Sequence, residues 1–386
     1  MSRIFPSRVA QSLLLGVAFA LLASPRAQCA DEDPRAEMHL LAKEITALQK
    51  FLLTDAEFTA SKNDAEIKKS LDSLNEHLGY LGKKSFTEDP ALKANLSLLQ
   101  QHLSDATRSF REGGKSYSRQ MMQSSLQMCI ACHTRRKAAD FSWPEPDAKD
   151  IPALDRADFL FATRQFSKGK ELYEAAISGF PENRTSQWSL RRAMASLAVF
   201  YARVSEDPKG GAEYFAKLAS MEKLPIYLKQ ESSSWAKEFA AWAKEAPKAT
   251  AAKATEASLL AEGKKLLRHD DFTMVSELGQ SFHVRRLRAS ALFHRVLELP
   301  GGKSPSKAAA LLYLGQIYPR ISSNMFFRFG EMYLKACITE YPKSGSSKAC
   351  YVALEFITAE GFSGSSGTNI PDDEQVELMR LKRIAY

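Results

Sequence analysis

The residues of this sequence best suited to chemistry are Cys129, Cys132 and His133, which occur together as Cys-Ile-Ala-Cys-His. This is the C-x-x-C-H motif, at which haem is attached covalently in c-type cytochromes. On a helix, positions i, i+3 and i+4 project from one side, so two thiols can form thioethers with the haem vinyl groups while the imidazole reaches the iron. The motif predicts one covalent haem c per chain, bound through Cys129 and Cys132, with His133 as the proximal iron ligand.

Two other kinds of site share part of this pattern. A redox-active C-x-x-C pair is typical of a βαβ context, which the surrounding sequence lacks. A zinc site needs further Cys or His ligands, and none is grouped near residues 129–133. Haem attachment is therefore the interpretation that the residue types favour.

Residues 1–30 have the charged, apolar and small segments of a secretory signal. Arg3 and Arg8 precede the apolar run 13–23, which is shorter than the roughly 20 residues needed to span a bilayer. We expect removal near Ala30 and export to the bacterial periplasm, with no membrane span in the mature chain. An uncleaved anchor and a lipoprotein at Cys29 are the alternatives.

The positions of the apolar residues predict an all-α fold. Between residues 31 and 140, apolar side chains recur every three or four residues, which is typical of helices with one buried face. Four such helices with short connections predict an antiparallel four-helix bundle, the haem domain, at residues 31–140. The repeating apolar positions in its first three helices are Met38, Leu41, Ile45, Leu48 and Leu52; Ile67, Leu71, Leu74, Leu78 and Leu81; and Leu92, Leu96, Leu99, Leu103 and Phe110.

This part of the chain resembles the helical-bundle cytochromes c, also called class II or cytochrome c-prime. The resemblance rests on the bundle pattern and on the motif from Cys129 to His133 near the end of the fourth helix. Family members commonly continue with two residues, an aromatic residue and an arginine, where this sequence has Arg136 and Lys137 in the last two positions. The resemblance implies a haem in the bundle core, with the first turns of helix one across the iron from His133.

Met38 is the core-facing residue in those first turns, on one stripe with Leu41 and Ile45. Its thioether is the candidate sixth ligand, which would raise the reduction potential of the iron. In the alternative, Met38 only fills space beside an open iron. His39 is the neighbouring candidate, turned about 100° away from the stripe.

The chain after residue 140 has a different organisation. Residues 141–152 contain Trp143, Pro144, Pro146 and several acidic residues, and we interpret them as a linker. Residues 153–360 resemble tetratricopeptide repeats, which implies helical hairpins that stack and hold a partner; an irregular helical domain is the alternative. The residues that carry this resemblance are Ala157, Leu160, Phe166, Tyr173, Ala176 and Pro181, then Leu314, Gly315, Tyr318, Tyr333, Leu334, Cys337, Tyr341 and Pro342. Residues 361–386 predict a flexible tail with a short helix.

Cys337 and Cys350 are predicted to form a disulfide. Pro342 and Gly345 mark a turn, and the two cysteines lie five residues before and after it. An antiparallel helical hairpin would bring them to similar height, and an oxidising compartment favours the bond. A pair of buried free thiols is the alternative.

The formal charge of +8 lies mostly after residue 140, where Lys and Arg alternate with Asp and Glu. This pattern is typical of a solvated helix surface and argues against nucleic-acid binding. The first functional hypothesis is electron transfer, with a redox partner protein docked by the repeats. The alternatives are an open-iron haem protein that binds a small gas or peroxide, and an envelope scaffold built on the repeats.

Overall fold

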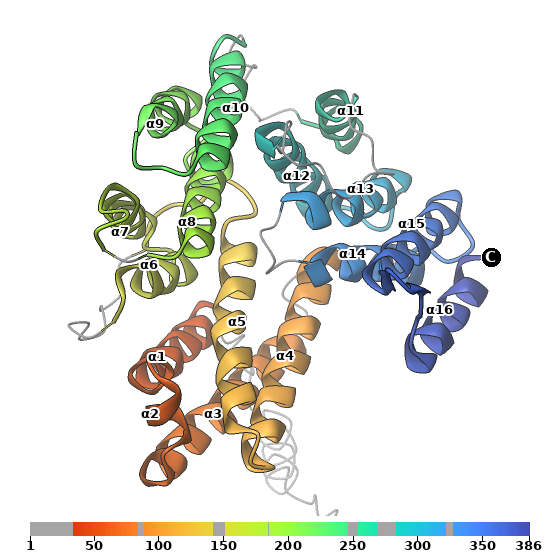
Figure 1. Ribbon diagram of the computed structural model, residues 1–386. Helices are drawn as coiled ribbons and strands as arrows, with labels where there is room; N and C mark the ends of the chain where they lie inside the picture. Colours follow the sequence, from red (N-terminus) through yellow and green to blue (C-terminus); the bar gives the residue numbers. More distant parts are fainter. Residues whose placement is uncertain are drawn as a thin grey trace, which may run out of the picture.

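The computed structural model describes residues 34–83, 89–141, 151–183, 185–245, 254–268, 283–321 and 327–386. The protein is all-α, because helices make up nearly all regular structure in these residues (Figure 1). No helix among them is long and apolar enough to cross a membrane. The expected signal peptide, with Cys29, and most of the expected linker lie outside the described residues.

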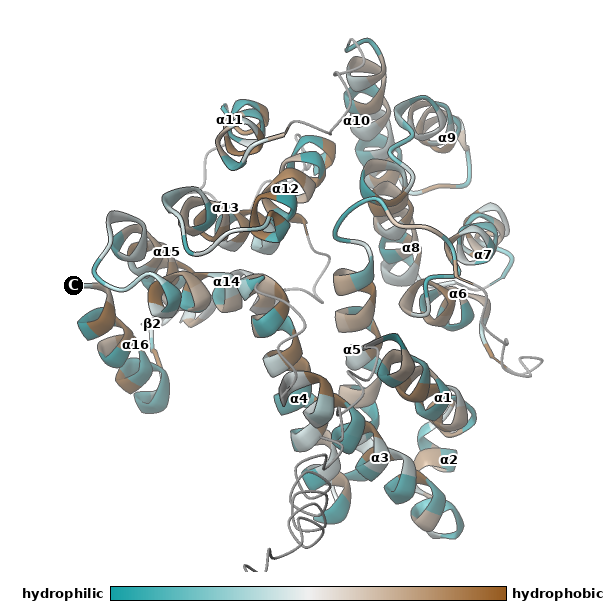
Figure 2. Ribbon diagram, turned by 180° about the vertical axis from the view of Figure 1, so that it is seen from behind, coloured by the Kyte–Doolittle hydropathy of each residue, from teal (hydrophilic) through white to brown (hydrophobic). Residues whose placement is uncertain are grey.

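The first four long helices share one hydrophobic core. They are α1 (Pro34–Leu52), α3 (Asp64–Lys83), α4 (Pro90–Arg111) and α5 (Lys115–His133), with the short α2 (Asp55–Thr59) and η1 (Ser61–Asn63) between the first two. In sequence order each long helix packs on the next, and α1 also contacts α5. The predicted apolar stripes supply this core, which includes Leu48, Leu71, Leu78, Leu103 and Phe110. Hydrophobic and hydrophilic residues accordingly alternate along the helices (Figure 2).

Capping residues explain where two of these helices begin. The side chain of Asp89 accepts a hydrogen bond from the backbone N–H of Ala91, and Pro90 occupies the first helical position of α4, where its fixed φ is favourable. Gly113 has a φ of 91° in the turn before α5, a conformation that glycine adopts without strain.

The remaining helices form two groups that flank α4 and α5 (Figure 1). The first group contains α6 (Ala153–Ala162), α7 (Phe166–Ser178), α8 (Gln187–Val199), η2 (Phe200–Val204), α9 (Pro208–Ser220) and α10 (Ile226–Ala243). The second contains α11 (Glu256–Leu266), α12 (His283–Glu298), α13 (Pro305–Ile321), α14 (Phe327–Glu340), α15 (Gly345–Gly361) and α16 (Asp372–Ala385). Between α15 and α16, β1 (Ser363–Gly364) pairs antiparallel with β2 (Gly367–Thr368).

Both groups contact the pair of helices α4 and α5, and α5 carries the motif. Helix α6 packs on α5, whereas α12 and α14 pack on α4. Ala91, Ile130 and Ala131 belong to the hydrophobic core of the later helices, while Met121 and Met122 belong to that of the first four. Helix α5 therefore contributes to both cores, and its last turn lies where they meet.

Two glycines allow close packing inside the later helix pairs. A Cβ atom on Gly169 of α7 would lie 2.5 Å from the ring of Phe161 on α6, and one on Gly315 of α13 would lie 2.4 Å from Leu334 on α14. A side chain at Gly169 would displace the fully buried Phe161.

The end of the chain is folded onto the second group. Cys337 of α14 and Cys350 of α15 form the disulfide expected from their spacing, with a Cα–Cα distance of 6.3 Å. Helix α16 packs on both α14 and α15 and buries Leu381 and Ala385 completely. The terminal helix expected from the sequence is thus an integral part of this core.

Candidate functional site

The C-x-x-C-H motif forms the last turns of α5. The helix ends at His133, where the Thr134 hydroxyl donates to the carbonyl oxygen of Ile130 at 2.7 Å. Cys129, Cys132 and His133 all line one cavity of about 500 Å³, and both cysteines are free thiols. The helical spacing therefore presents the three side chains to a common space, as the motif requires.

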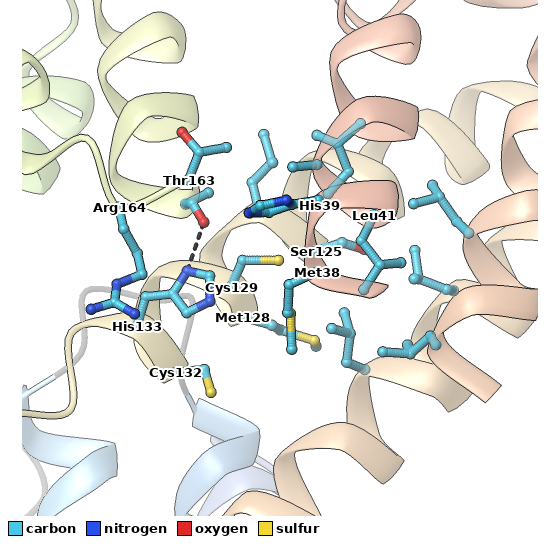
Figure 3. Close-up of a pocket in the computed structure, with 18 of the residues that line it drawn as sticks. Met38, His39, Leu41, Ser125, Met128, Cys129, Cys132, His133, Thr163 and Arg164 are labelled. Atoms are coloured by element: carbon cyan, nitrogen blue, oxygen red, sulfur yellow. Dashed lines mark hydrogen bonds between the residues drawn. The ribbon is translucent and has the colours of Figure 1, made fainter. Parts of the chain in front are cut away.

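The rest of the cavity wall is largely apolar and is supplied mainly by the first three long helices. Figure 3 shows His133 on one side of the cavity and Met38 and Leu41 of α1 on the facing side. Further lining side chains are Ile45, Leu48, Leu74, Leu78, Leu96, Leu99, Leu103, Met122 and Met128. A cavity of this volume with a mostly apolar lining is typical of small-molecule and cofactor sites. With two cysteines and a histidine in its wall, its residues fit a covalently attached haem.

A backbone carbonyl orients the imidazole of His133. Its Nδ1 atom lies 2.7 Å from the carbonyl oxygen of Ala162, the last residue of α6. A carbonyl oxygen can only accept, so Nδ1 carries the proton and Nε2 keeps its lone pair for a metal. Burial lowers the pKa of His133 to about 4, which keeps the imidazole neutral at physiological pH.

Burial shifts the pKa of the two thiols in the opposite direction and likewise favours their neutral form. It raises the pKa of Cys129 to about 12, helped by Cys132, and it also raises the pKa of Cys132. Thiolates are the reactive form in disulfide exchange and in zinc binding. The two neutral thiols are therefore poorly suited to a redox C-x-x-C pair. Among the described residues no three His, Cys, Asp or Glu side chains are grouped as around a metal ion.

The segment after the motif closes one side of the cavity. The backbone N–H of Phe141 donates to the carbonyl oxygen of Arg164 at 2.9 Å, and Nη2 of Arg164 donates to that of Ala139 at 3.3 Å. The ring of Phe141 in turn packs against His39, with centroids 5.1 Å apart. Phe141, Arg164 and His39 all line the cavity, so the turn that orients His133 also supports this wall.

Behind the motif, a buried arginine joins three helices. Arg135 pairs with Asp89, the capping residue of α4, at 2.8 Å, and with Glu298 at the end of α12 at 3.1 Å. Arg136 pairs with the second oxygen of Glu298 at 2.6 Å. The motif is thereby fixed to the first helices and to the second group at once.

The structure brings Met38 into the same cavity as the three motif residues, and also its neighbour His39. Other histidines have partners elsewhere. His77 pairs with Glu37 at 3.0 Å, and His102 contacts the Ser124 hydroxyl at 2.7 Å.

Several cavity residues had no sequence signal. Ala162 acts through its backbone oxygen, which any residue could supply. Phe329 belongs to α14, and Arg164 lies in the turn between α6 and α7. Both reach the cavity only because the later helices pack against the first ones. Asn95 also lines the cavity; a polar residue beside the stripe residue Leu96 was the one available sign.

No protein-family model, curated protein or solved structure matches this chain.

Proposed function

We propose that this protein is a periplasmic c-type cytochrome that carries one covalent haem and transfers single electrons. The observation that carries the proposal is the convergence of Cys129, Cys132 and His133 on one apolar cavity of about 500 Å³. The chain resembles the helical-bundle cytochromes c in having the C-x-x-C-H motif at the end of its fourth long helix, α5.

In this proposal the two cysteines hold the haem through thioether bonds, and His133 binds its iron through Nε2. The haem supplies a metal centre that changes oxidation state by one electron. The carbonyl oxygen of Ala162 holds the proton on Nδ1 of His133, which keeps the imidazole in the ligating tautomer and raises its basicity. The apolar side chains of the lining would surround the haem with groups of low polarity.

Met38 is our candidate for the sixth ligand. It faces the cavity from α1, opposite His133 (Figure 3), and it packs against the core of the first helices. A thioether ligand would favour the ferrous state and so raise the reduction potential. The hydrocarbon surroundings have the same effect, because they disfavour the extra charge of the ferric state.

The later helices are the proposed docking region for a redox partner protein. Both groups reach the motif, through the contact of Ala162 with His133 and through the pairing of Glu298 with Arg135. A partner bound there would lie on helices in direct contact with the haem-bearing turn.

The test is a redox titration of the exported protein, followed by absorption spectroscopy. We expect one reversible one-electron transition and, in the reduced protein, the sharp spectrum of a six-coordinate low-spin haem c that binds carbon monoxide slowly. His133→Ala should keep the haem attached but lose this spectrum. A wild-type protein that is high-spin and binds carbon monoxide at once would contradict electron transfer as the main function and favour binding of a small gas or peroxide.

A further inference from the structure

The outer face of α16 exposes two apolar side chains near the middle of the helix. Val376 is 61% exposed and Met379 is 53% exposed. The buried side chains of the helix, Leu378, Leu381 and Ala385, lie on the other side, where α16 packs on α14 and α15. Figure 1 shows α16 at the outer edge of the second group. Isolated exposed apolar residues are common on protein surfaces, so these two alone do not indicate a binding surface.

Two charged residues extend this pair into one stripe along the helix. Asp372, Val376, Met379 and Arg383 follow one another in steps of four, three and four residues. These steps place all four within about 60° of one another around the helix axis, and all four are exposed. Alternating steps of three and four are the spacing of the a and d positions through which two helices pack side by side. The α16 stripe therefore has the pattern of a short helix-pairing surface.

The charges at the two ends make the α16 stripe complementary to a second copy of itself. When two identical helices pair about a two-fold axis, each residue meets the same residue type on both sides of the axis. If the helices are antiparallel and Val376 lies opposite Met379 of the second copy, then Asp372 lies opposite Arg383 of that copy, because both pairs are centred on the same point of α16. Opposite charges then meet at both ends, whereas a parallel pair would bring like charges together.

Both charged ends of the stripe are available for such a contact. Within α16, Arg380 pairs with Glu377 at 2.7 Å, but neither Asp372 nor Arg383 forms an ion pair with any residue that the structure describes. Acidic residues in the first turn and basic residues in the last also favour the helix dipole. The dipole accounts for the sign of these charges, but not for their alignment with two exposed apolar side chains.

We propose that the protein forms an antiparallel two-fold dimer through the α16 stripe. A second copy supplies the matching order of charges by symmetry. Membrane surfaces and nucleic acids instead attract faces of uniformly positive charge, and the stripe carries Asp372 at one end. None of the four stripe residues lines the cavity that contains the motif, so the dimer leaves that cavity unchanged and does not depend on the proposed function.

The short length of the helix predicts a reversible dimer. The 14 residues of α16 extend over about 21 Å. A contact along this length should bury less than the roughly 1,200 Å² at which standard complexes begin, which is typical of transient association. We therefore expect a dissociation constant of about 10–100 μM.

Sedimentation velocity of the exported protein, from about 1 to 500 μM, measures this dissociation constant. Wild type should pass from monomer to dimer over this range. Asp372→Arg would place arginines opposite each other at both ends of the contact, and Arg383→Asp would place aspartates there. Each variant should associate at least roughly tenfold more weakly because like charges repel, and circular dichroism checks that each is folded.

An equimolar mixture of these two variants is the decisive measurement. In a mixed pair, the introduced arginine of one chain opposes the introduced aspartate of the other, and the unchanged Arg383 of the first opposes the unchanged Asp372 of the second. Attraction is thereby restored at both ends, so the mixture should dimerise about as tightly as wild type although neither variant does so alone.

A change at the apolar middle of the stripe has a matched control on another helix. Val376→Asp should weaken the dimer at least roughly tenfold because it buries a charge in the contact, whereas Ile226→Asp on α10 should not, although Ile226 is 70% exposed. A wild type that is monomeric at every concentration, a mixture that associates no better than its components, or equal weakening by Ile226→Asp and Val376→Asp would each overturn the proposal.

Discussion

Nη1 of Arg135 lies 2.8 Å from Oδ2 of Asp89, close to the C-x-x-C-H motif, and both side chains are buried. Removing one partner of a buried ion pair leaves the other charge without compensation. We expect Arg135→Gln to lower the free energy of unfolding by about 3–5 kcal/mol, measured by denaturant titration.

The adjacent arginine provides the control. Arg136 also pairs with Glu298, but its side chain is 56% exposed, and exposed pairs contribute less than about 1 kcal/mol. Equal losses of unfolding free energy for Arg136→Gln and Arg135→Gln would show that burial does not determine how much the ion pair stabilises the protein.

A second prediction concerns Met38, the proposed iron ligand opposite His133. Met38→Ala should convert the reduced haem to a high-spin form that binds carbon monoxide at least tenfold faster, because a ligand is replaced by a vacancy. His39→Ala should leave the spectrum unchanged, since His39 packs against Phe141. The reverse result would assign the sixth position to His39, and two unchanged spectra would show that neither residue binds iron.

A third prediction concerns pH and the buried carboxyl group of Asp158. This carboxyl accepts from Gln127 of α5 at 2.9 Å and pairs with Arg192 of α8. Burial raises its pKa from 3.8 to about 6. A folded-state pKa above the unfolded one means that the contribution to stability is complete below about pH 4 and is lost as the pH rises through about 6.

The free energy of unfolding should therefore fall over this interval by about 3 kcal/mol more in wild type than in Asp158→Asn, which cannot titrate at this position. Chemical denaturation at pH 4 and pH 7 measures the difference. Parallel pH profiles for the two proteins would mean that Asp158 is ionised in the folded state at pH 4.

A fourth prediction concerns the Cys337–Cys350 disulfide. Closing a loop of this length stabilises a protein by about 3 kcal/mol on the chain-entropy model. Cys337→Ala with Cys350→Ala should lose about this amount, and a reductant should destabilise wild type but not the double variant. Two thiols that react in the unfolded, unreduced wild-type protein would show that the bond does not form.

The sequence predicted the features that depend on the type and spacing of side chains. The stripe from Met38 through Leu48 set the buried face of α1, and the spacing of Cys129, Cys132 and His133 placed all three on one side of α5. The spacing of Cys337 and Cys350 likewise sufficed to pair them, because the turn between their helices was marked by Pro342 and Gly345.

The sequence did not predict features that arise from contacts between distant segments. The hydrogen-bond acceptor for His133 is the backbone oxygen of Ala162. Because every residue has such an oxygen, residue type cannot identify this acceptor. Arg135 was not singled out from the sequence, and only the approach of α12 to α4 makes it a buried partner of Asp89 and Glu298. Such tertiary contacts form the ion pairs of Arg135 beside the motif and one wall of the cavity.

The most direct test of the central claim is the intact mass of the exported protein under denaturing conditions. Expression with cytochrome c maturation should give the mass of the chain plus one haem, with colour that survives acid-acetone extraction. Cys129→Ser with Cys132→Ser should have the mass of the chain alone. A wild-type protein at the mass of the chain alone, or one whose colour is extracted, would contradict the assignment of Cys129, Cys132 and His133 as a covalent haem site.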